Sequence, residues 1–273
     1  YLDGQDRIGS GAGGVAGNDV LAGLSLASNI TGANHLFGER ISGLSGYVYR
    51  DANANSAREN GEPGLNNIVV YLYGIDANGP LTRFAVTGNS GFYFFNDLYT
   101  GTYRLVEGAL VGYLDKDESV GTLGGALGGI APDDDEINSI AFARGQYGES
   151  YNFGELIPSS LSGLVYYDIN GNQSNDGGDA PINGVTVVLS GTTDRAPSVA
   201  YTATTVGGGF TFAGLRPGVY SLIETQPDGY TDGPENIGTA GGVATGEDTI
   251  SAIALQAGTG AQNYGFSERQ TGL

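Results

Sequence analysis

The sequence predicts an all-β protein made of tandem two-sheet β-sandwiches, and two observations support this class. Short runs rich in Val, Ile, Tyr and Phe are bounded by Gly, Asn or Asp, as is typical of strands joined by tight turns. Similar runs recur along the 273 residues, which indicates an array of repeats and not one large domain. No segment has a convincing helical pattern.

Two complete copies of one repeat can be aligned. Residues 43–49 match residues 160–167, and Gly-Phe-Tyr-Phe at 91–94 matches Gly-Phe-Thr-Phe at 209–212. Both copies end with Phe-Gly-Glu or Phe-Ser-Glu. Residues 1–40 start with Tyr-Leu-Asp and end near Phe-Gly-Glu, as the last third of each complete copy does.

The predicted domain organisation follows from this alignment. Residues 1–40 are the C-terminal part of a truncated repeat, residues 41–157 and 158–269 are complete β-sandwich repeats, and residues 270–273 start a further repeat or form a tail. The short junction at Pro158 predicts that the two complete domains abut.

Strands are expected in the first complete copy near residues 45–50, 67–74, 82–88, 91–96, 102–107, 136–143 and 148–154. Bulky residues occur at both parities in Tyr71-Leu72-Tyr73, so strict inward and outward alternation looks imperfect. About seven antiparallel strands in about 115 residues predict a two-sheet sandwich with Greek-key connections.

The composition narrows the possible functions. There are 11 Lys and Arg residues against 30 Asp and Glu, and the net charge of −19 disfavours nucleic acid and anionic membranes as partners and favours cations. Cysteine is absent and histidine occurs once, which excludes disulfides, thiolate catalysis and zinc–thiolate sites. No run approaches the roughly 20 apolar residues of a transmembrane helix, so we expect any signal peptide or anchor outside this segment.

An acidic loop follows the first predicted strand of each complete copy, at 51–62 and 168–179. When the first Asp is position 1, side-chain oxygens fall at positions 1, 3, 5, 9 and 12, and a backbone carbonyl is available at position 7. This is the ligand spacing of an EF-hand calcium loop. The predicted Ca²⁺ ligands are Asp51, Asn53, Asn55, Ala57, Glu59 and Glu62 in the first loop and Asp168, Asn170, Asn172, Ser174, Asp176 and Asp179 in the second.

Calcium suits these loops because it accepts six to eight hard oxygen ligands in a pliable shell. The alternative is a solvated turn, since Asn, Asp and Gly populate turns for local reasons. Two loops that keep the same oxygen positions while the intervening residues differ favour calcium. The loops depart from the EF-hand pattern in two ways: Ser56 and Gln173 replace the glycine at position 6, and strands flank the loop.

The loops, the following Pro-Gly-Leu or Pro-Ile-Asn-Gly, the Gly-Phe-x-Phe strand and the Glu-x-x-x-x-Gly-Tyr block together resemble a known family. The family that these motifs resemble is the calcium-binding B-type repeats (SdrD B-like or Cna-B-like) of bacterial serine-aspartate-repeat surface adhesins. The resemblance covers nearly the whole chain. It implies prealbumin-like or Ig-like seven-stranded Greek-key sandwiches, calcium-dependent rigidity, and a stalk that holds another domain away from the cell.

Related sandwiches close a Lys-to-Asn isopeptide bond beside a buried Glu, and Glu107 and Glu224 occupy the corresponding place. The only lysine, Lys116, lies in an acidic loop, so we interpret these two glutamates as structural. A second acidic concentration recurs in the copies and either forms a second calcium site or keeps the surface soluble. It comprises Asp115, Asp117, Asp133, Asp134, Asp135 and Glu136 in the first copy, and Asp232, Glu235, Glu247 and Asp248 in the second.

These features predict a structural protein and not an enzyme: a calcium-stiffened stalk or fibre segment of a bacterial cell-surface or extracellular protein, whose partners are neighbouring repeats or subunits. The alternative is an adhesive module for a glycan or protein receptor, which requires an exposed aromatic patch. Residues 1–40 supply only closing strands, so we expect another polypeptide to complete them by strand complementation.

Overall fold

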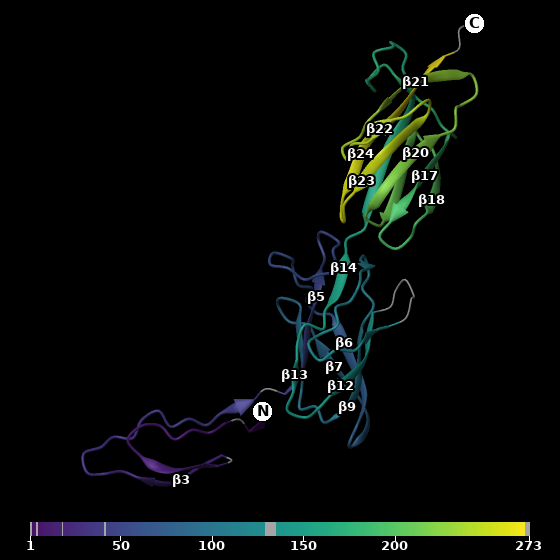
Figure 1. The fold of residues 1–273 in the computed structure, drawn as a ribbon. Helices are drawn as coiled ribbons and strands as arrows, with labels where there is room; N and C mark the ends of the chain where they lie inside the picture. The colour runs from purple at the N-terminus through teal and green to yellow at the C-terminus, as the bar shows by residue number, and fades with distance from the viewer. Residues whose placement is uncertain (1, 4, 18, 41, 129–134, 271–273) are drawn as a thin grey trace. The chain divides into compact units, whose positions relative to one another are not determined.

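The structure is a computed structural model that describes residues 2–3, 5–17, 19–40, 42–128 and 135–270 (Figure 1). All regular elements in these ranges are β-strands, which confirms the all-β class. Within the same ranges, no helix has the length and apolar character needed to cross a membrane. The tail at 271–273 and the predicted acidic residues Asp133 and Asp134 lie outside the described residues.

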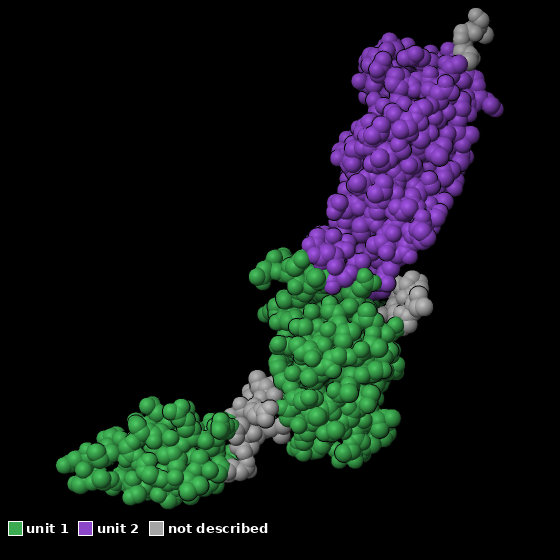
Figure 2. Space-filling model, in the orientation of Figure 1, with its two compact units in different colours: residues 1–49, 57–109, 117–154 green, residues 50–56, 110–116, 155–273 purple. Residues whose placement is uncertain are grey.

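Two compact units can be distinguished (Figure 2). The first comprises residues 1–49, 57–109 and 117–154, and the second comprises residues 50–56, 110–116 and 155–273. The domain boundaries at 40/41 and 157/158 stay predictions.

The first repeat consists of two sheets. One has the order β10-β14-β5-β13, with β8 also paired to β5; its strands are Leu114–Asp115 (β10), Phe153–Leu156 (β14), Gly43–Arg50 (β5), Tyr147–Gly148 (β13) and Phe92–Asn96 (β8). The other has the order β11-β12-β9-β6-β7; its strands are Ala126–Leu127 (β11), Glu136–Phe142 (β12), Gly101–Glu107 (β9), Val69–Asp76 (β6) and Gly79–Val86 (β7).

The expected strands therefore exist, with one correction. The segment predicted as one strand at 148–154 is divided between two short strands, β13 and β14, both of which pair with β5. Ser150, between them, has a left-handed φ of 67°, and this turn breaks the run. The short strands β10 and β11 were not predicted.

The second repeat has the same design. One sheet has the order β16-β15-β24-β21, with β19 paired to β15; its strands are Ala180–Pro181 (β16), Ser159–Tyr167 (β15), Gly260–Gln270 (β24), Tyr230–Asn236 (β21) and Gly209–Leu215 (β19). The other has the order β18-β17-β20-β23-β22; its strands are Val199–Thr204 (β18), Thr186–Thr193 (β17), Gly218–Glu224 (β20), Thr249–Leu255 (β23) and Val243–Ala244 (β22).

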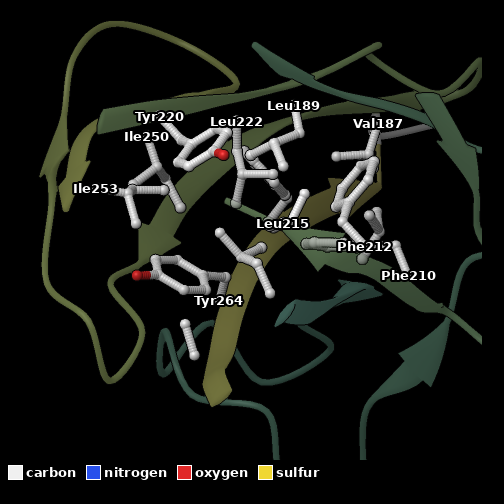
Figure 3. Close-up of a cluster of buried hydrophobic side chains, with 14 of the residues drawn as sticks. Val187, Leu189, Phe210, Phe212, Leu215, Tyr220, Leu222, Ile250, Ile253 and Tyr264 are labelled. Atoms are coloured by element: carbon white, nitrogen blue, oxygen red, sulfur yellow. The ribbon is translucent and has the colours of Figure 1, made fainter. Parts of the chain in front are cut away.

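Each sandwich has its own apolar core, and that of the second repeat is shown in Figure 3. Alternation along the strands supplies the core, because every second side chain of a strand points to the same face. In β17, Val187 and Leu189 are fully buried. In β6, Leu72 is fully buried while its neighbour Tyr71 is 36% exposed. The expectation of imperfect alternation in this strand was wrong, because bulky residues occupy both the buried and the exposed face.

A left-handed residue interrupts the same strand in both repeats. Ser139 in β12 has φ 57° and Ala252 in β23 has φ 55°. The register of β12 against β9, and of β23 against β20, shifts at these residues, as expected for a β-bulge. Gly23 in β3 (Val20–Ser25) has φ 63°, so the N-terminal segment repeats the feature.

Residues 2–40 form short antiparallel pairs of their own. The pairs are β1 (Leu2–Asp3) with β4 (Glu39–Arg40) and β2 (Gly13–Gly17) with β3. An isolated bridge also joins Arg7 to Leu36. Large apolar side chains here remain exposed, among them Val15 (70%), Leu26 (55%) and Phe37 (58%).

A glycine in the first strand of each repeat lies where no side chain fits. A Cβ atom at Gly163 would lie 2.2 Å from the carbonyl oxygen of Tyr264, and one at Gly46 would lie 1.6 Å from the carbonyl oxygen of Tyr151. The repeated Leu-Ser-Gly motif therefore reflects the close approach of the first strand to the closing segment.

Replacing this glycine should weaken the sandwich. We expect Gly163→Ala to lower the free energy of unfolding by about 1–3 kcal/mol, because the methyl group forces the strands apart. Gly260→Ala is the matched control in the same sheet, since its Cβ would meet nothing nearer than 3.9 Å. Urea unfolding of both variants tests this; equal stabilities would contradict the explanation.

Candidate metal centre

The first acidic loop begins at a buried carboxylate. Asp51 is fully buried, directly after β5. Its Oδ1 accepts the backbone N–H of Asn55 at 3.2 Å, and its Oδ2 accepts that of Ser56 at 2.7 Å. Asn53 Oδ1 also accepts the N–H of Asn55, at 3.1 Å. Further along, the backbone N–H of Glu59 donates to Glu62 Oε2 at 3.0 Å. Positions 1, 3 and 5 are thus tied together, as are positions 9 and 12.

The second loop begins in the same way. The Asp168 carboxylate accepts three backbone N–H groups, those of Gly171 (2.7 Å), Asn172 (3.2 Å) and Gln173 (2.8 Å). An Asp at position 1 therefore organises both loops through backbone hydrogen bonds, which is the local role of Asp in turns.

The remaining predicted residues of this loop share one hydrogen-bond network. Asn170 and Asn172 donate their side-chain amides to Asp176 Oδ2, at 3.1 and 2.7 Å. Asn172 Oδ1 accepts the backbone N–H of Ser174. The Asp179 carboxylate accepts the N–H groups of Ile169 and Asp176, which closes the loop. Hydrogen bonds from Gly178, Asn172 and Asn170 lower the pKa of Asp176, so its carboxylate stays charged.

Both loops make the sharp turn of an EF-hand without its glycine. The residues at position 6, Ser56 and Gln173, have φ 64° and 65°. Those at position 4, Ala54 and Gly171, have φ 60° and 71°. The left-handed conformation that glycine favours is therefore present at position 6 in both loops.

Hydrogen bonds link the residues of each acidic loop, but the loop carboxylates do not converge on one common position. Among the described residues, none of the twelve predicted ligands belongs to a group of three carboxylates whose oxygens lie within 4.8 Å of one another. The Asn170 and Asn172 amides present N–H groups to Asp176, so cation binding would require them to turn their carbonyl oxygens inward.

A tighter carboxylate group lies elsewhere in the second repeat. Glu224 ends β20, Glu268 lies in β24, and Asp248 directly precedes β23. One oxygen from each lies within 4.8 Å of the others. Glu224 is 3% exposed and Glu268 fully buried, and neither carboxylate oxygen of Glu224 receives a hydrogen bond from the described residues. We call Glu224, Asp248 and Glu268 the buried carboxylate trio.

Like charges in a buried site raise each other's pKa. Burial, together with the carboxylates of Glu268 and Asp248, raises the pKa of Glu224 to about 9. Burial raises the pKa of Glu268 to about 7, although a hydrogen bond from Gln226 opposes this. Burial and the carboxylates of Asp248 and Glu235 raise the pKa of nearby Asp232 to about 6. The trio therefore favours either a proton or a bound cation.

The trio is bonded to the acidic loop through the backbone. The N–H of Asp168 donates to the carbonyl oxygen of Glu268 at 2.9 Å, and the N–H of Glu224 donates to that of Asp248 at 3.0 Å. The first repeat makes the matching bonds: Asp51 N–H to the Glu155 carbonyl and Glu107 N–H to the Asp135 carbonyl, both at 2.9 Å. The two repeats thus share this backbone framework.

A hard divalent cation fits the trio. Three carboxylates, one of which receives no hydrogen bond from the described part of the chain, supply the oxygen ligands and negative charge that calcium prefers. The interpretation of Glu107 and Glu224 as structural stays a prediction, and the second acidic concentration contains Asp248 of the trio. Lys116, the only lysine of the chain, is buried, and its Nζ lies 3.3 Å from Asp194 Oδ2.

The family profile of the SdrD B-like domain matches residues 42–154 and 159–266. The chain belongs to the SdrD B-like domain family. This family consists of structural and adhesin domains and not of enzymes. The chain is therefore part of a structural repeat protein that is extracellular or on the cell surface.

Two relatives are serine-aspartate repeat-containing proteins of Staphylococcus aureus strain Newman. Protein D is 30% identical over 197 residues, which cover 71% of this chain and 14% of that protein. Protein C is 27% identical over 207 residues, which cover 75% of this chain and 21% of that protein. This SdrD B-like chain thus spans a small part of the length of either relative.

Two solved structures of pilins are also similar. GBS52, the minor pilin of Streptococcus agalactiae, has a TM-score of 0.33 and 14% identity, with 85% of this chain and 97% of that chain covered. The shaft pilin SpaA of Lactobacillus rhamnosus GG has a TM-score of 0.29 and 11% identity, with 85% and 99% covered.

The buried trio predicts how stability depends on pH when metal is absent. A carboxyl group whose pKa is raised by folding stabilises the fold fully below its unfolded pKa, and this contribution is lost as pH rises through the folded pKa. In the presence of a chelator, we expect Tm to fall from about pH 5, just above the unfolded pKa of a glutamate, to about pH 9, the folded pKa of Glu224. Glu224→Gln should flatten this fall. Thermal unfolding of both proteins across this range tests the prediction, and parallel curves would contradict it.

Proposed function

We propose that this SdrD B-like chain is a calcium-stiffened segment of a stalk or fibre. The buried carboxylate trio is the observation that carries the proposal. Buried carboxylates without donors destabilise a fold unless a proton or cation neutralises them. Outside the cell, a divalent cation can neutralise the trio at neutral pH while its carboxylates stay unprotonated.

The acidic loops support the same proposal. Asp51 and Asp168 hold two loops in the same left-handed turns, although the intervening residues differ. Because Asp168 is also hydrogen-bonded to the backbone of Glu268, a cation in the loop and one in the trio would order the same end of the sandwich. The loop ligands are those predicted from the sequence, with the trio as a second site.

Calcium should raise the stability of the protein. Ligand that binds only the folded state stabilises it by about 2.7 kcal/mol at a free concentration of 100 times Kd. We therefore expect a higher Tm in calcium than in chelator, and several binding events by isothermal titration calorimetry. Asp51→Ala combined with Glu62→Ala should remove one binding event and leave those of the second repeat.

The control removes a charge outside both sites. Asp97→Asn deletes an exposed carboxylate of the first unit and should leave calcium binding unchanged. Identical melting curves in calcium and chelator for the unmodified protein would overturn the proposal.

Strand complementation of residues 1–40 is a second proposal. The left-handed residue Gly23 aligns β3 with β12, so Leu24 and Leu26 match Ile140 and Phe142. Ile140 and Phe142 are buried at 0% and 2% exposure, whereas Leu24 and Leu26 are 46% and 55% exposed. In the first repeat β12 pairs with β11 on one side and with β9 on the other, whereas among the described strands β3 pairs with β2. A strand of another polypeptide, placed beside β3 as β9 is placed beside β12, would cover Leu24 and Leu26.

A peptide with the sequence of residues 101–107, which form β9, tests this proposal. Added to the chain, it should slow amide hydrogen exchange in residues 20–25, because a new strand would hydrogen-bond their backbone. A peptide of scrambled order is the control. Unchanged exchange with both peptides would rule out complementation by this strand.

A further inference from the structure

The outward face of β6 and β7 in the first repeat carries an exposed apolar stripe. Tyr71 in β6 lies directly opposite Phe84 in β7. Phe84 is 68% exposed, Ile75 69% and Val86 50%. The rings of Tyr71 and Tyr73 stack with centroids 6.2 Å apart. We call Tyr71, Tyr73, Ile75, Phe84 and Val86 the aromatic stripe.

The fold does not require these side chains. Val70 pairs with Glu107 and Val187 pairs with Glu224, which aligns β6 with β17 and β7 with β18. The second repeat then has small or polar residues at the positions of the stripe: Val188, Ser190, Thr192, Thr202 and Thr204. Since the same sheet forms without aromatics at these positions, their exposure in the first repeat points to a role other than folding.

The strand β7 also has a free edge. It is the last strand in the order of its sheet, and among the described strands only β6 pairs with it. Its single charged residue, Arg83, donates to the backbone oxygen of Asn96 at 2.7 Å. Natural edge strands are commonly protected by charges or proline. In β7 these devices are limited to Arg83 and to Pro80 near the start of the strand.

A groove of about 470 Å³ adjoins the stripe on the outward face. It is lined by Tyr73, Ile75, Leu81, Arg104, Asn138 and other residues of the same sheet. The guanidinium of Arg104 lies 4.6 Å from the centre of the Tyr73 ring and is bridged to Glu136 at 3.0 Å. Tyr, Phe and Arg surrounded by polar residues are typical of the centre of protein–protein interfaces.

We propose that the aromatic stripe and the free edge of β7 form a docking site for an extended polypeptide segment of another protein, which adds a strand to the sheet. Main-chain hydrogen bonds to β7 provide the affinity of this recognition mode, and side chains beside Phe84 and Val86 provide the selectivity. The free backbone edge of β7 favours a peptide over a glycan, because a peptide can add a strand to it.

The charge of the chain restricts the partner further. At a net charge of −19, the chain repels other copies of itself and acidic peptides. The segment is therefore neutral or basic, with apolar side chains at alternate positions. This inference does not depend on calcium binding, because no residue of the stripe belongs to the loops or the trio.

Designed peptides test the proposal on the whole chain. The probes are a basic peptide of alternating Val and Thr with a Lys at each end, its acidic counterpart with Glu at each end, and the basic peptide with alternate backbone amides N-methylated. The basic peptide should bind in fluorescence anisotropy and slow amide exchange in residues 79–86. The acidic peptide should bind more weakly, and the N-methylated one should not bind, because it cannot complete the hydrogen-bond ladder.

The second repeat provides matched variants. Tyr71→Val combined with Phe84→Thr copies Val188 and Thr202, and should weaken binding at least about tenfold while leaving Tm nearly unchanged. Val188→Tyr combined with Thr202→Phe carries the aromatic pair to the second repeat and should create a second binding site there. Thr204→Ala at the second-repeat edge is the neutral control.

Three results would overturn the proposal. Equal binding of the N-methylated peptide would show that docking uses side chains without strand addition. Binding of a neutral oligosaccharide to the stripe, without binding of any peptide, would assign the surface to a glycan. No binding of any probe would leave the stripe without this function.

Discussion

The parallel pairing of the first and last strands of each repeat is the constraint on which the rest of the structure depends. In the second repeat, β15 and β24 run side by side from Ser160 and Gly260 to Tyr167 and Glu268. This pairing ends where the acidic loop begins, so the N–H of Asp168 reaches the carbonyl of Glu268. Residues far apart in sequence thereby share one end of the sandwich, and the Glu268 side chain is buried beside Glu224.

That arrangement would couple the proposed metal binding to stability. The same burial that completes the sheet raises the pKa of Glu224 and Glu268, because water no longer solvates their charges. Neutralisation by a proton suits acidic conditions, and neutralisation by a divalent cation suits neutral ones. The fold of a surface protein with this site would therefore be more stable where free calcium is abundant and less stable where free calcium is scarce.

The two repeats share a backbone but not a surface. Loop turns, bulge residues and the glycines of the first strands coincide, as Ser56 with Gln173 and Ser139 with Ala252 show. The outward faces differ, since Tyr71 and Phe84 stand where Val188 and Thr202 do. Repeats can keep the framework that stiffens them while individual copies acquire binding surfaces, because the outward face of a sheet contributes little to the core.

The sequence by itself determined the repeat pattern, the strands and the oxygen positions of the loops, because these depend on local alternation, turn residues and spacing. The left-handed turn at position 6 also follows from its place in the loop, although Ser56 and Gln173 stand there instead of the usual glycine. Only the tertiary structure decided that Glu224, Asp248 and Glu268 meet, and that Tyr71 faces solvent beside Phe84. These contacts depend on strand pairing and sheet packing, which join residues that no local pattern relates.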